Sequence, residues 1–273
     1  MRTGEPALEG LLDLAVSIAV EAGRVLSERF SAAGPTQAVT DSVRSKSSRT
    51  DLVTEADQAS DRLIVSRLAA ARPHDAILAE ESGSSAGTSG LTWVVDPLDG
   101  TINFVYGFPV FGVSIACRSG SGTLVGVVHD PLRDETFTAV AGGGAYRDGA
   151  RLRLGPGPVM SEALVGTGFS YDSNRRAAQG LLIAHVLPQV RDIRRAGAAA
   201  IDLCWVAAGR LDGFYEAGLA PWDLAAGSLL VTEAGGTVER LDGLITGEPD
   251  VPTLLAAAPG LAGPLRDLLV SPR

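Results

Sequence analysis

Two aspartates three residues apart, Asp96 and Asp99, are the part of the sequence best suited to chemistry. They follow an apolar run that predicts a buried strand, and Pro97 and Gly100 shape the bend around them. Carboxylate oxygens at such a position favour magnesium or manganese over zinc. If Thr101 opens a helix, the amides of Gly100 and Thr101 point toward an anion. The segment therefore predicts a site for a divalent cation and a phosphate group.

Three further acids stand at the ends of predicted elements. Asp57 completes a capping box that Thr54 begins, Glu80 follows a short apolar strand, and Asp223 lies in the first turn of a helix. Each acid alone is typical of a helix cap or a solvated charge. Open sheets place their sites where strands end, so the repetition favours one acidic cluster.

The elements that position these acids follow from periodicity and turn residues. We expect helices over residues 8–26, 55–71, 175–186, 201–208 and 221–234 and near Leu265, and strands over 76–79, 93–96, 163–166, 211–216 and 253–257. The β-rich run 111–154 predicts an antiparallel meander with a hairpin turn at 142–144, and 84–90 reads as a flexible connection.

The pattern predicts helices packed on two sheets, one mostly antiparallel and one mixed. We expect one compact catalytic unit with two halves, an α+β half over residues 1–155 and an α/β half over 156–273. The polar stretch 31–50, which contains Lys46, is either a linker or a functional lid.

The net charge of -9 argues against a nucleic-acid surface. It would also repel an anionic substrate, so bound cations must reverse the sign locally. Glu9 and Asp13 interrupt the apolar N-terminal stretch, which excludes a membrane span there. Cys117 and Cys204 lie in apolar runs without a CxxC motif, as expected of free core thiols in the cytoplasm.

Other catalytic chemistries lack their motifs. The three histidines are scattered, and no G-x-S-x-G segment supplies a serine nucleophile. Gly142-Gly143-Gly144 matches neither a dinucleotide fingerprint nor a P-loop. Metal-assisted hydrolysis of a phosphate ester therefore remains the chemistry that the acids favour.

The same residues resemble the inositol monophosphatase family of magnesium-dependent, lithium-sensitive phosphatases, and most of all its bacterial inositol-1-monophosphatase branch. The resemblance is carried by four segments that span nearly the whole chain. They are residues 51–57, 80–82, 96–104 and 221–236, the last containing Pro221-Trp222-Asp223 and Glu233-Ala234-Gly235-Gly236.

The resemblance implies a set of metal ligands and catalytic groups. Glu80, Asp96 and the Leu98 carbonyl would hold a first Mg²⁺, and Asp96, Asp99 and Asp223 a second. Glu80 would also anchor a weaker third ion through water, and Mn²⁺ would substitute. Thr101, hydrogen-bonded to Asp57, would orient the attacking water.

The resemblance also implies how substrate is held. The amides of Gly100 and Thr101 would cradle the phosphate, while Asp99, Asp223 and Glu216 and the backbone of Gly197, Ala198 and Ala199 would contact substrate. Lys46 matches a mobile-loop lysine. Ala198, Ala220 and the pair Arg194 and Arg195 depart from common members at positions that shape substrate choice. The implied fold is a five-layer α-β-α-β-α sandwich, similar to fructose-1,6-bisphosphatase and usually a homodimer.

Three functions stay open at this point. The first is hydrolysis of inositol 1-phosphate or a similar phosphorylated polyol. The second is the same chemistry on the substrate of a sister branch, which is histidinol phosphate, fructose 1,6-bisphosphate or adenosine 3',5'-bisphosphate. The third is a regulatory, partner-binding protein on the same scaffold.

Overall fold

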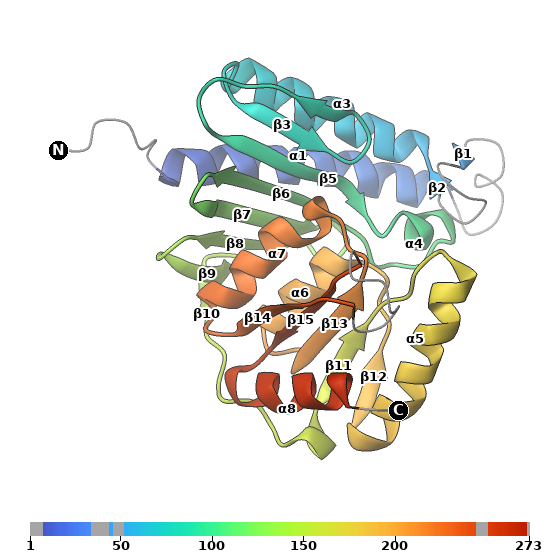
Figure 1. The fold of residues 1–273 in the computed structure, drawn as a ribbon. Coiled ribbons are helices and arrows are strands. Elements are labelled where there is room, and N and C mark those ends of the chain that lie inside the picture. Colours follow the sequence, from blue (N-terminus) through green and yellow to red (C-terminus); the bar gives the residue numbers. More distant parts are fainter. Residues whose placement is uncertain (1–7, 34–43, 46–51, 244–250, 272–273) are drawn as a thin grey trace.

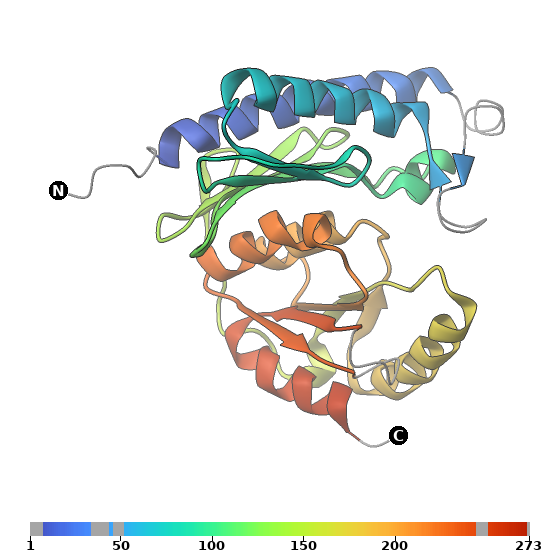
Figure 2. The same cartoon turned by 45° about the horizontal axis from the view of Figure 1, so that its top comes forward.

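The computed structural model describes residues 8–33, 44–45, 52–243 and 251–271. Their helices and strands stack in five layers, helix, sheet, helix, sheet and helix, which Figure 2 shows from top to bottom. Figure 1 shows that the chain builds the upper layers first and then the lower ones, except that α6 and α7 return to the middle. The α+β five-layer sandwich is therefore confirmed.

The first sheet has eight strands and is antiparallel except between β3 and β5. In spatial order it contains β10 (Ala150–Leu152), β9 (Gly144–Arg147), β8 (Glu135–Val140), β7 (Gly122–Asp130), β6 (Gly112–Ser119), β5 (Thr92–Asp99), β3 (Ala76–Ala79) and β4 (Gly83–Ser85). A separate antiparallel pair joins β1 (Arg44–Ser45) to β2 (Leu52–Val53).

The second sheet has five strands and is mixed. Its order is β12 (Asp192–Arg194), β11 (Leu164–Thr167), β13 (Gly213–Ala217), β15 (Thr253–Ala257) and β14 (Thr237–Leu241). Strand β11 is parallel to both of its neighbours, and the β13–β15 and β14–β15 pairs are antiparallel.

Three pairs of helices cover the sheet faces. The outer pair is α1 (Leu8–Ala33) and α3 (Glu55–Ala71), the middle pair is α6 (Ala199–Ala207) and α7 (Pro221–Glu233), and the last pair is α5 (Ser173–Val186) and α8 (Pro259–Val270). Shorter pieces are α4 (Thr101–Val105), η1 (Met160–Glu162) and η2 (Leu187–Gln189). No described helix is long and apolar enough to cross a bilayer.

Alternation along the strands divides the core into three clusters, because successive strand side chains point to opposite faces. On β5, Trp93 and Val95 pack against α1 and α3, whereas Val94 packs toward α6 and α7. On β13, Phe214 joins the middle cluster and Tyr215 the cluster under α5 and α8. The middle helices thus bury apolar faces of both sheets.

Most expected elements are present, with differences at edges. The first helix continues to Ala33, seven residues beyond the periodic pattern that ended at Leu26. Strand β4 contains Ser84 and Ser85 of the expected flexible connection 84–90, together with Gly83 before it. Strand β5 runs on to Asp99, and β9, β12 and β14 are additional strands. Lys46 lies outside the described residues. The division at residues 155 and 156 stays a prediction.

Candidate active site

A β-bulge turns Asp96 and Asp99 to the same face of the first sheet. In a regular strand, residues three apart point to opposite faces. Asp96 pairs with Ser114, however, and Asp99 pairs with Gly112, so three steps on β5 match two steps on β6. The extra residue reverses the alternation. Both acids therefore share the face of Val94, toward α6 and α7.

The polar backbone groups of the bulge are satisfied locally. Pro97 has no N–H to donate, which suits a bulge. Its carbonyl accepts a hydrogen bond of 2.7 Å from Ser60 Oγ, and the Leu98 N–H donates to Asp96 Oδ1 at 3.0 Å. These bonds fix the backbone that presents the two acids.

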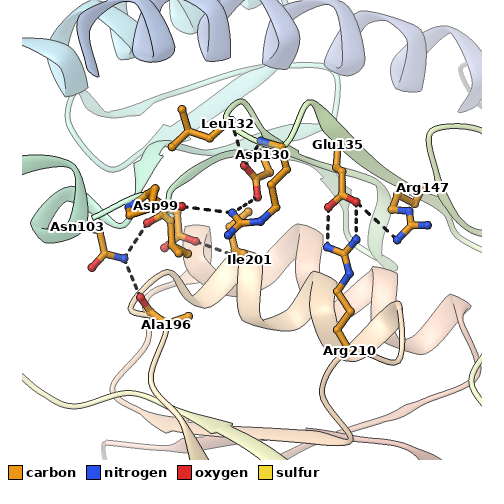
Figure 3. A network of polar contacts seen from close by, with 12 residues as sticks. Asp99, Asn103, Asp130, Leu132, Glu135, Arg147, Ala196, Ile201 and Arg210 are labelled. Carbon is orange, nitrogen blue, oxygen red and sulfur yellow. Dashed lines mark hydrogen bonds and ion pairs between the residues drawn. The ribbon is translucent and has the colours of Figure 1, made fainter. Parts of the chain in front are cut away.

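The first turn of α6 holds Asp99. Its Oδ1 accepts from the Ala199 N–H at 3.0 Å, and its Oδ2 accepts from the Ala200 and Ile201 N–H groups at 2.8 and 3.3 Å. Figure 3 shows this carboxylate directly above the start of the helix. Because each carboxylate oxygen has two lone pairs, one on Oδ1 is left for a cation.

Thr101 and Asp57 are joined across two helix starts. Thr101 Oγ1 donates to Asp57 Oδ1 at 2.9 Å, with the Leu98 carbonyl 3.1 Å away. Asp57 Oδ2 accepts from the Thr54 N–H at 2.8 Å and from its hydroxyl, which closes the expected capping box. Asp57 is 1% exposed, so its acceptor atoms are fixed in place.

Four carboxylates lie within electrostatic reach of one another. Burial, followed by the charges of Glu80, Asp99 and Asp223, raises the pKa of Asp96 well above its ordinary value. Burial raises the pKa of Asp99 to about 7, although the three α6 N–H groups favour its charged form. Burial and the neighbouring acids also raise the pKa of Asp223, whose Oδ2 accepts from the Ala220 N–H at 2.7 Å.

This cluster fits hard divalent cations by its chemistry. The described groups that shift the pKa of Asp96 are three carboxylates and the Leu98 N–H. The cluster therefore concentrates negative charge, and its side chains offer only oxygen atoms as metal ligands. Among the described residues, no three Asp, Glu, His or Cys side chains lie close enough together to hold an ion as they stand. The argument that the cluster fits a divalent cation therefore rests on its oxygen ligands and on the repulsion between its carboxylates, which a bound cation would offset.

A cavity of about 180 Å³ opens beside the acids. Six of the predicted site residues line it, namely Asp99, Gly100, Gly197, Ala199, Glu216 and Asp223. Asp57, Glu80, Asp96, Leu98, Thr101 and Ala198 are not among its lining residues. The structure thus brings six of the eight expected substrate contacts into one space, and Thr101 and Ala198 are the two that its lining leaves out.

Glu216 extends from the middle of β13 and lies against the backbone of Gly168. A Cβ at residue 168 would overlap the carboxylate carbon and both oxygens of Glu216. Burial raises the pKa of Glu216 to about 7; the positive charge of Arg195 opposes this rise, and the negative charge of Asp99 adds to it. The absence of a side chain at Gly168 lets this half-buried carboxylate reach the cavity.

Short-range packing anchors the α4 segment that carries Gly100 and Thr101. Gly100 has φ of +91°, and a Cβ there would lie 2.9 Å from the Val110 carbonyl oxygen. Asn103 Nδ2 donates to the carbonyls of Val110 and Ala196 at 2.7 and 2.8 Å, which ties α4 to the loop before α6 (Figure 3).

Aromatic packing adds a second anchor. The rings of Phe30, Phe104 and Phe111 pack in tilted and edge-to-face orientations with centroids 5.0–5.5 Å apart, so the end of α1 supports α4 from the outer face. The site therefore receives support from three layers of the fold.

A polar link lies further along the face between the first sheet and α6. Glu135 on β8 accepts two hydrogen bonds from the Arg210 guanidinium, one of them 2.6 Å long, and Arg147 lies 3.6 Å away (Figure 3). The hydrogen bonds from Arg210 lower the pKa of Glu135, burial raises it, and the positive charges of the nearby arginines lower it further. The pKa therefore lies below its ordinary value. Arg210 follows α6, so the pair joins the first sheet to the middle layer.

Comparison with known proteins decides the family. The sequence profile of the Inositol monophosphatase family matches residues 7–269. Inositol-1-monophosphatase from Mycobacterium bovis is 47% identical over 232 residues, which cover 82% of this chain and 79% of that protein. Nus factor SuhB from Escherichia coli K12 is 40% identical over 235 residues, covering 85% and 86%. This chain belongs to the inositol monophosphatase family.

The fold agrees with that assignment. The crystal structure of the extragenic suppressor protein SuhB from Bartonella henselae is similar with a TM-score of 0.85 at 35% identity, over 95% of this chain and 98% of that one. As a member of the inositol monophosphatase family, the chain is a phosphatase, and the predicted family resemblance is confirmed.

Part of the cavity wall escaped the sequence analysis. Residues 169–171, Arg175 and Gln179 line the cavity beside the expected groups. In the sequence, Arg175 and Gln179 look like polar positions on an amphipathic surface helix, so no pattern distinguished them.

Proposed function

We propose that this protein is a magnesium-dependent phosphomonoesterase that hydrolyses inositol 1-phosphate or a similar polyol phosphate. The observation that carries the proposal is the group of four acids Glu80, Asp96, Asp99 and Asp223, two of which share one face of a bulged strand, beside a cavity. The Mycobacterium bovis relative, named inositol-1-monophosphatase, supports the choice of substrate.

The proposed ligands divide into two sets. Glu80, Asp96 and the Leu98 carbonyl would hold one Mg²⁺, and Asp96, Asp99 and Asp223 the other, with Glu80 reaching a third through water. Magnesium bound there would neutralise phosphate charge and make a water molecule more acidic. Mn²⁺, which prefers similar oxygen ligands, would substitute.

The chain's own groups would position the reactants. Because the Thr101 hydroxyl donates its hydrogen bond to Asp57, the lone pairs of Thr101 Oγ1 are left to accept a hydrogen bond from the attacking water and orient it. The Gly100 and Thr101 amides, at the start of α4, would hold the phosphate. Glu216 would accept hydrogen bonds from hydroxyl groups of the leaving polyol in the cavity.

Phosphate release from inositol 1-phosphate by wild type and Asp96→Asn tests the proposal. The asparagine amide keeps the shape and the acceptor for the Leu98 N–H but removes one anion, so we expect turnover to fall at least ~100-fold with an unchanged thermal melt. Asp13→Asn on exposed α1 is the matched control and should behave as wild type. Near-normal turnover of Asp96→Asn at ordinary magnesium concentrations would refute the assignment.

The substrate is tested on a panel that adds histidinol phosphate, fructose 1,6-bisphosphate and adenosine 3',5'-bisphosphate. Inositol 1-phosphate should be hydrolysed at least as well as histidinol phosphate. A flat response to inositol 1-phosphate beside strong release from another ester would move the protein to that sister branch.

A second, non-catalytic role is favoured by one observation, the name Nus factor SuhB of the Escherichia coli relative. We propose for this chain that the scaffold also binds a protein partner. Affinity capture with the purified chain should then return a transcription or translation complex equally for wild type and Asp96→Asn. Capture that disappears with Asp96→Asn, or no complex with either protein, would contradict a role independent of catalysis.

A further inference from the structure

A second cavity, of about 460 Å³, lies beside α7 and shares Leu219 with the lining of the active-site cavity. Arg118 and Thr123 reach it from β6 and β7 of the first sheet. Arg240 and Leu254 reach it from β14 and β15 of the second sheet. Helix α7, which Figure 1 shows between the two sheets, supplies a third wall. The volume lies within the roughly 300–1,000 Å³ that is typical of pockets for small ligands.

The charge of this second cavity is opposite to that of the whole protein. The net charge of the chain is -9, yet two arginines line the cavity and none of its described lining residues is acidic. Arg240 Nε donates to Asp242 at 2.8 Å, so an ion pair balances this arginine. Arg118, by contrast, forms no ion pair or side-chain hydrogen bond with any described residue. Its guanidinium is therefore the group in this cavity that fits an anion.

The backbone of β6 directs Arg118 toward α7. Ala116, two residues earlier, belongs to the core cluster of the middle helices, and side chains two apart on a strand share a face. Arg118 is exposed at the end of this row, where it lines the cavity together with Leu224 of α7. The guanidinium thus stands at the edge of an apolar surface rather than in open solvent.

The remaining wall is mainly aliphatic. Leu219, Pro221, Leu224 and Leu254 line it, and none of the described lining residues is aromatic. Leu219 and Leu224 are half-buried and Pro221 is exposed, so an apolar ligand would remove their surface from water. An aliphatic wall beside one arginine complements a carboxylate with an aliphatic body, because the guanidinium fork matches both carboxylate oxygens with parallel hydrogen bonds.

Residues 219–223 connect the two cavities. Leu219 lines both of them, and Pro221 lines the second cavity and is the first residue of α7. The Ala220 N–H donates to Asp223 Oδ2 at 2.7 Å, and Asp223 lines the active-site cavity. A ligand that packs on Leu219 and Pro221 therefore contacts the same turn that holds a proposed metal ligand.

We propose that the second cavity is an effector site for a small aliphatic carboxylate, which Arg118 binds, and that its occupancy changes the affinity of the active site for Mg²⁺ through residues 219–223. The regulatory part of this inference rests on the proposed magnesium-dependent function, whereas binding of the carboxylate does not. Coupling between two sites is reciprocal, so Mg²⁺ must change the affinity for the carboxylate by the same factor.

Calorimetry with octanoate tests the site, with octanol and acetate as the two halves of the probe. On metal-free wild type, octanoate should bind at least ~10-fold more tightly than either half. Arg118→Gln should weaken octanoate at least ~10-fold and leave octanol unchanged, while Arg118→Lys should retain part of the affinity. Arg153→Gln is the control, because this exposed arginine lines neither cavity and its loss changes the net charge equally.

The coupling is measured as the Mg²⁺ concentration that gives half-maximal phosphate release from the preferred ester. Saturating octanoate should shift this concentration at least ~5-fold, and acetate at the same concentration should not. Arg118→Gln should abolish the shift and keep wild-type turnover without octanoate. Calorimetry in Mg²⁺ should show the octanoate Kd changed by the same factor.

The outcomes separate the effector site from the proposed function. Failure of octanoate to bind, or equal binding by Arg118→Gln, would overturn the inference and leave the phosphatase intact. Binding through Arg118 with no change in the half-saturating Mg²⁺ concentration would overturn the regulatory role. A protein that releases phosphate from no ester would refute the proposed function and the regulation together, while binding of octanoate that depends on Arg118 would still support the site.

Discussion

The contact between Gly168 and Glu216 allows a test of the substrate pocket that spares the metal ligands. In Gly168→Ala, the new methyl group would occupy the space of the Glu216 carboxylate, well inside the roughly 3.5–4.0 Å at which non-bonded carbons settle. The backbone at Gly168 is outside the left-handed region, and the nearest atoms to the methyl group are all from this side-chain end. The carboxylate must therefore move, while the fold need not.

The expected magnitude follows from what the carboxylate does. A hydrogen bond to a charged group contributes about 1.5–3 kcal/mol. If Glu216 accepts one from the leaving group and the displaced carboxylate loses it, kcat/KM should fall about 10- to 150-fold. Stability should change by no more than about 1 kcal/mol, since alanine at a compatible backbone position also reduces the entropy of the unfolded chain.

The assay is a double-mutant cycle of Gly168→Ala and Glu216→Gln, with kcat/KM for the preferred substrate and thermal melts for all four proteins. Because both changes remove the same interaction, the double variant should be no worse than Glu216→Gln within about threefold. Gly10→Ala, where a Cβ meets nothing within 4 Å, is the control. Wild-type kcat/KM in Gly168→Ala, or losses that simply multiply, would show that this contact does not position the carboxylate.

Four further outcomes are expected. Thr101→Val should lower kcat about 100-fold with little change in KM, because it removes the group that Asp57 orients toward water; equal losses in kcat and affinity would instead indicate a binding role. Chelation of metal should abolish phosphate release, and added Mg²⁺ or Mn²⁺ should restore it; activity that survives exhaustive chelation would contradict the cation site. Phe111→Ala should cost about 3–5 kcal/mol of unfolding free energy, since this ring is fully buried against two others; a loss below about 1 kcal/mol in urea unfolding would show that the cluster is not a support. Arg210→Gln should destabilise by about 1 kcal/mol at neutral pH. The lowered pKa of Glu135 means that this stabilisation is present above its ordinary value of 4.5 and is lost as pH falls through the folded value, so melts of the two proteins should converge in acid.

Much of the fold was predictable because the core elements leave strong patterns. The buried residues of α1, such as Leu11, Ile18 and Leu26, repeat at helical spacing, and Thr54 and Asp57 mark the start of α3. The strands that escaped prediction are mainly β4, β12 and β14, which are edge strands. An edge strand is short and half solvated, so its pairing depends on a neighbour rather than on its own residues.

The candidate site, like the fold, was predictable from the sequence only in part. Asp96 and Asp99 were predictable because an apolar strand, a proline and a glycine surround them in the sequence. That they share a face was not, since the bulge depends on pairing with β6. Gln179 and Arg195 line the cavity from α5 and from the loop before α6, so this part of the cavity wall has no signature in one stretch of chain.

The bulge on β5 also determines how this segment can vary. Pro97 and Leu98 resemble a loop, where natural proteins usually accept insertions and deletions. Removing one of them would restore regular pleating with the two aspartates two residues apart, which keeps both on one face of the sheet. The deletion would instead take away either the Pro97 carbonyl that accepts from Ser60 Oγ or the Leu98 backbone groups that contact Asp96 and Thr101. The extra residue of the bulge thus contributes backbone groups to the site, and these are lost by a deletion but kept when a side chain is exchanged.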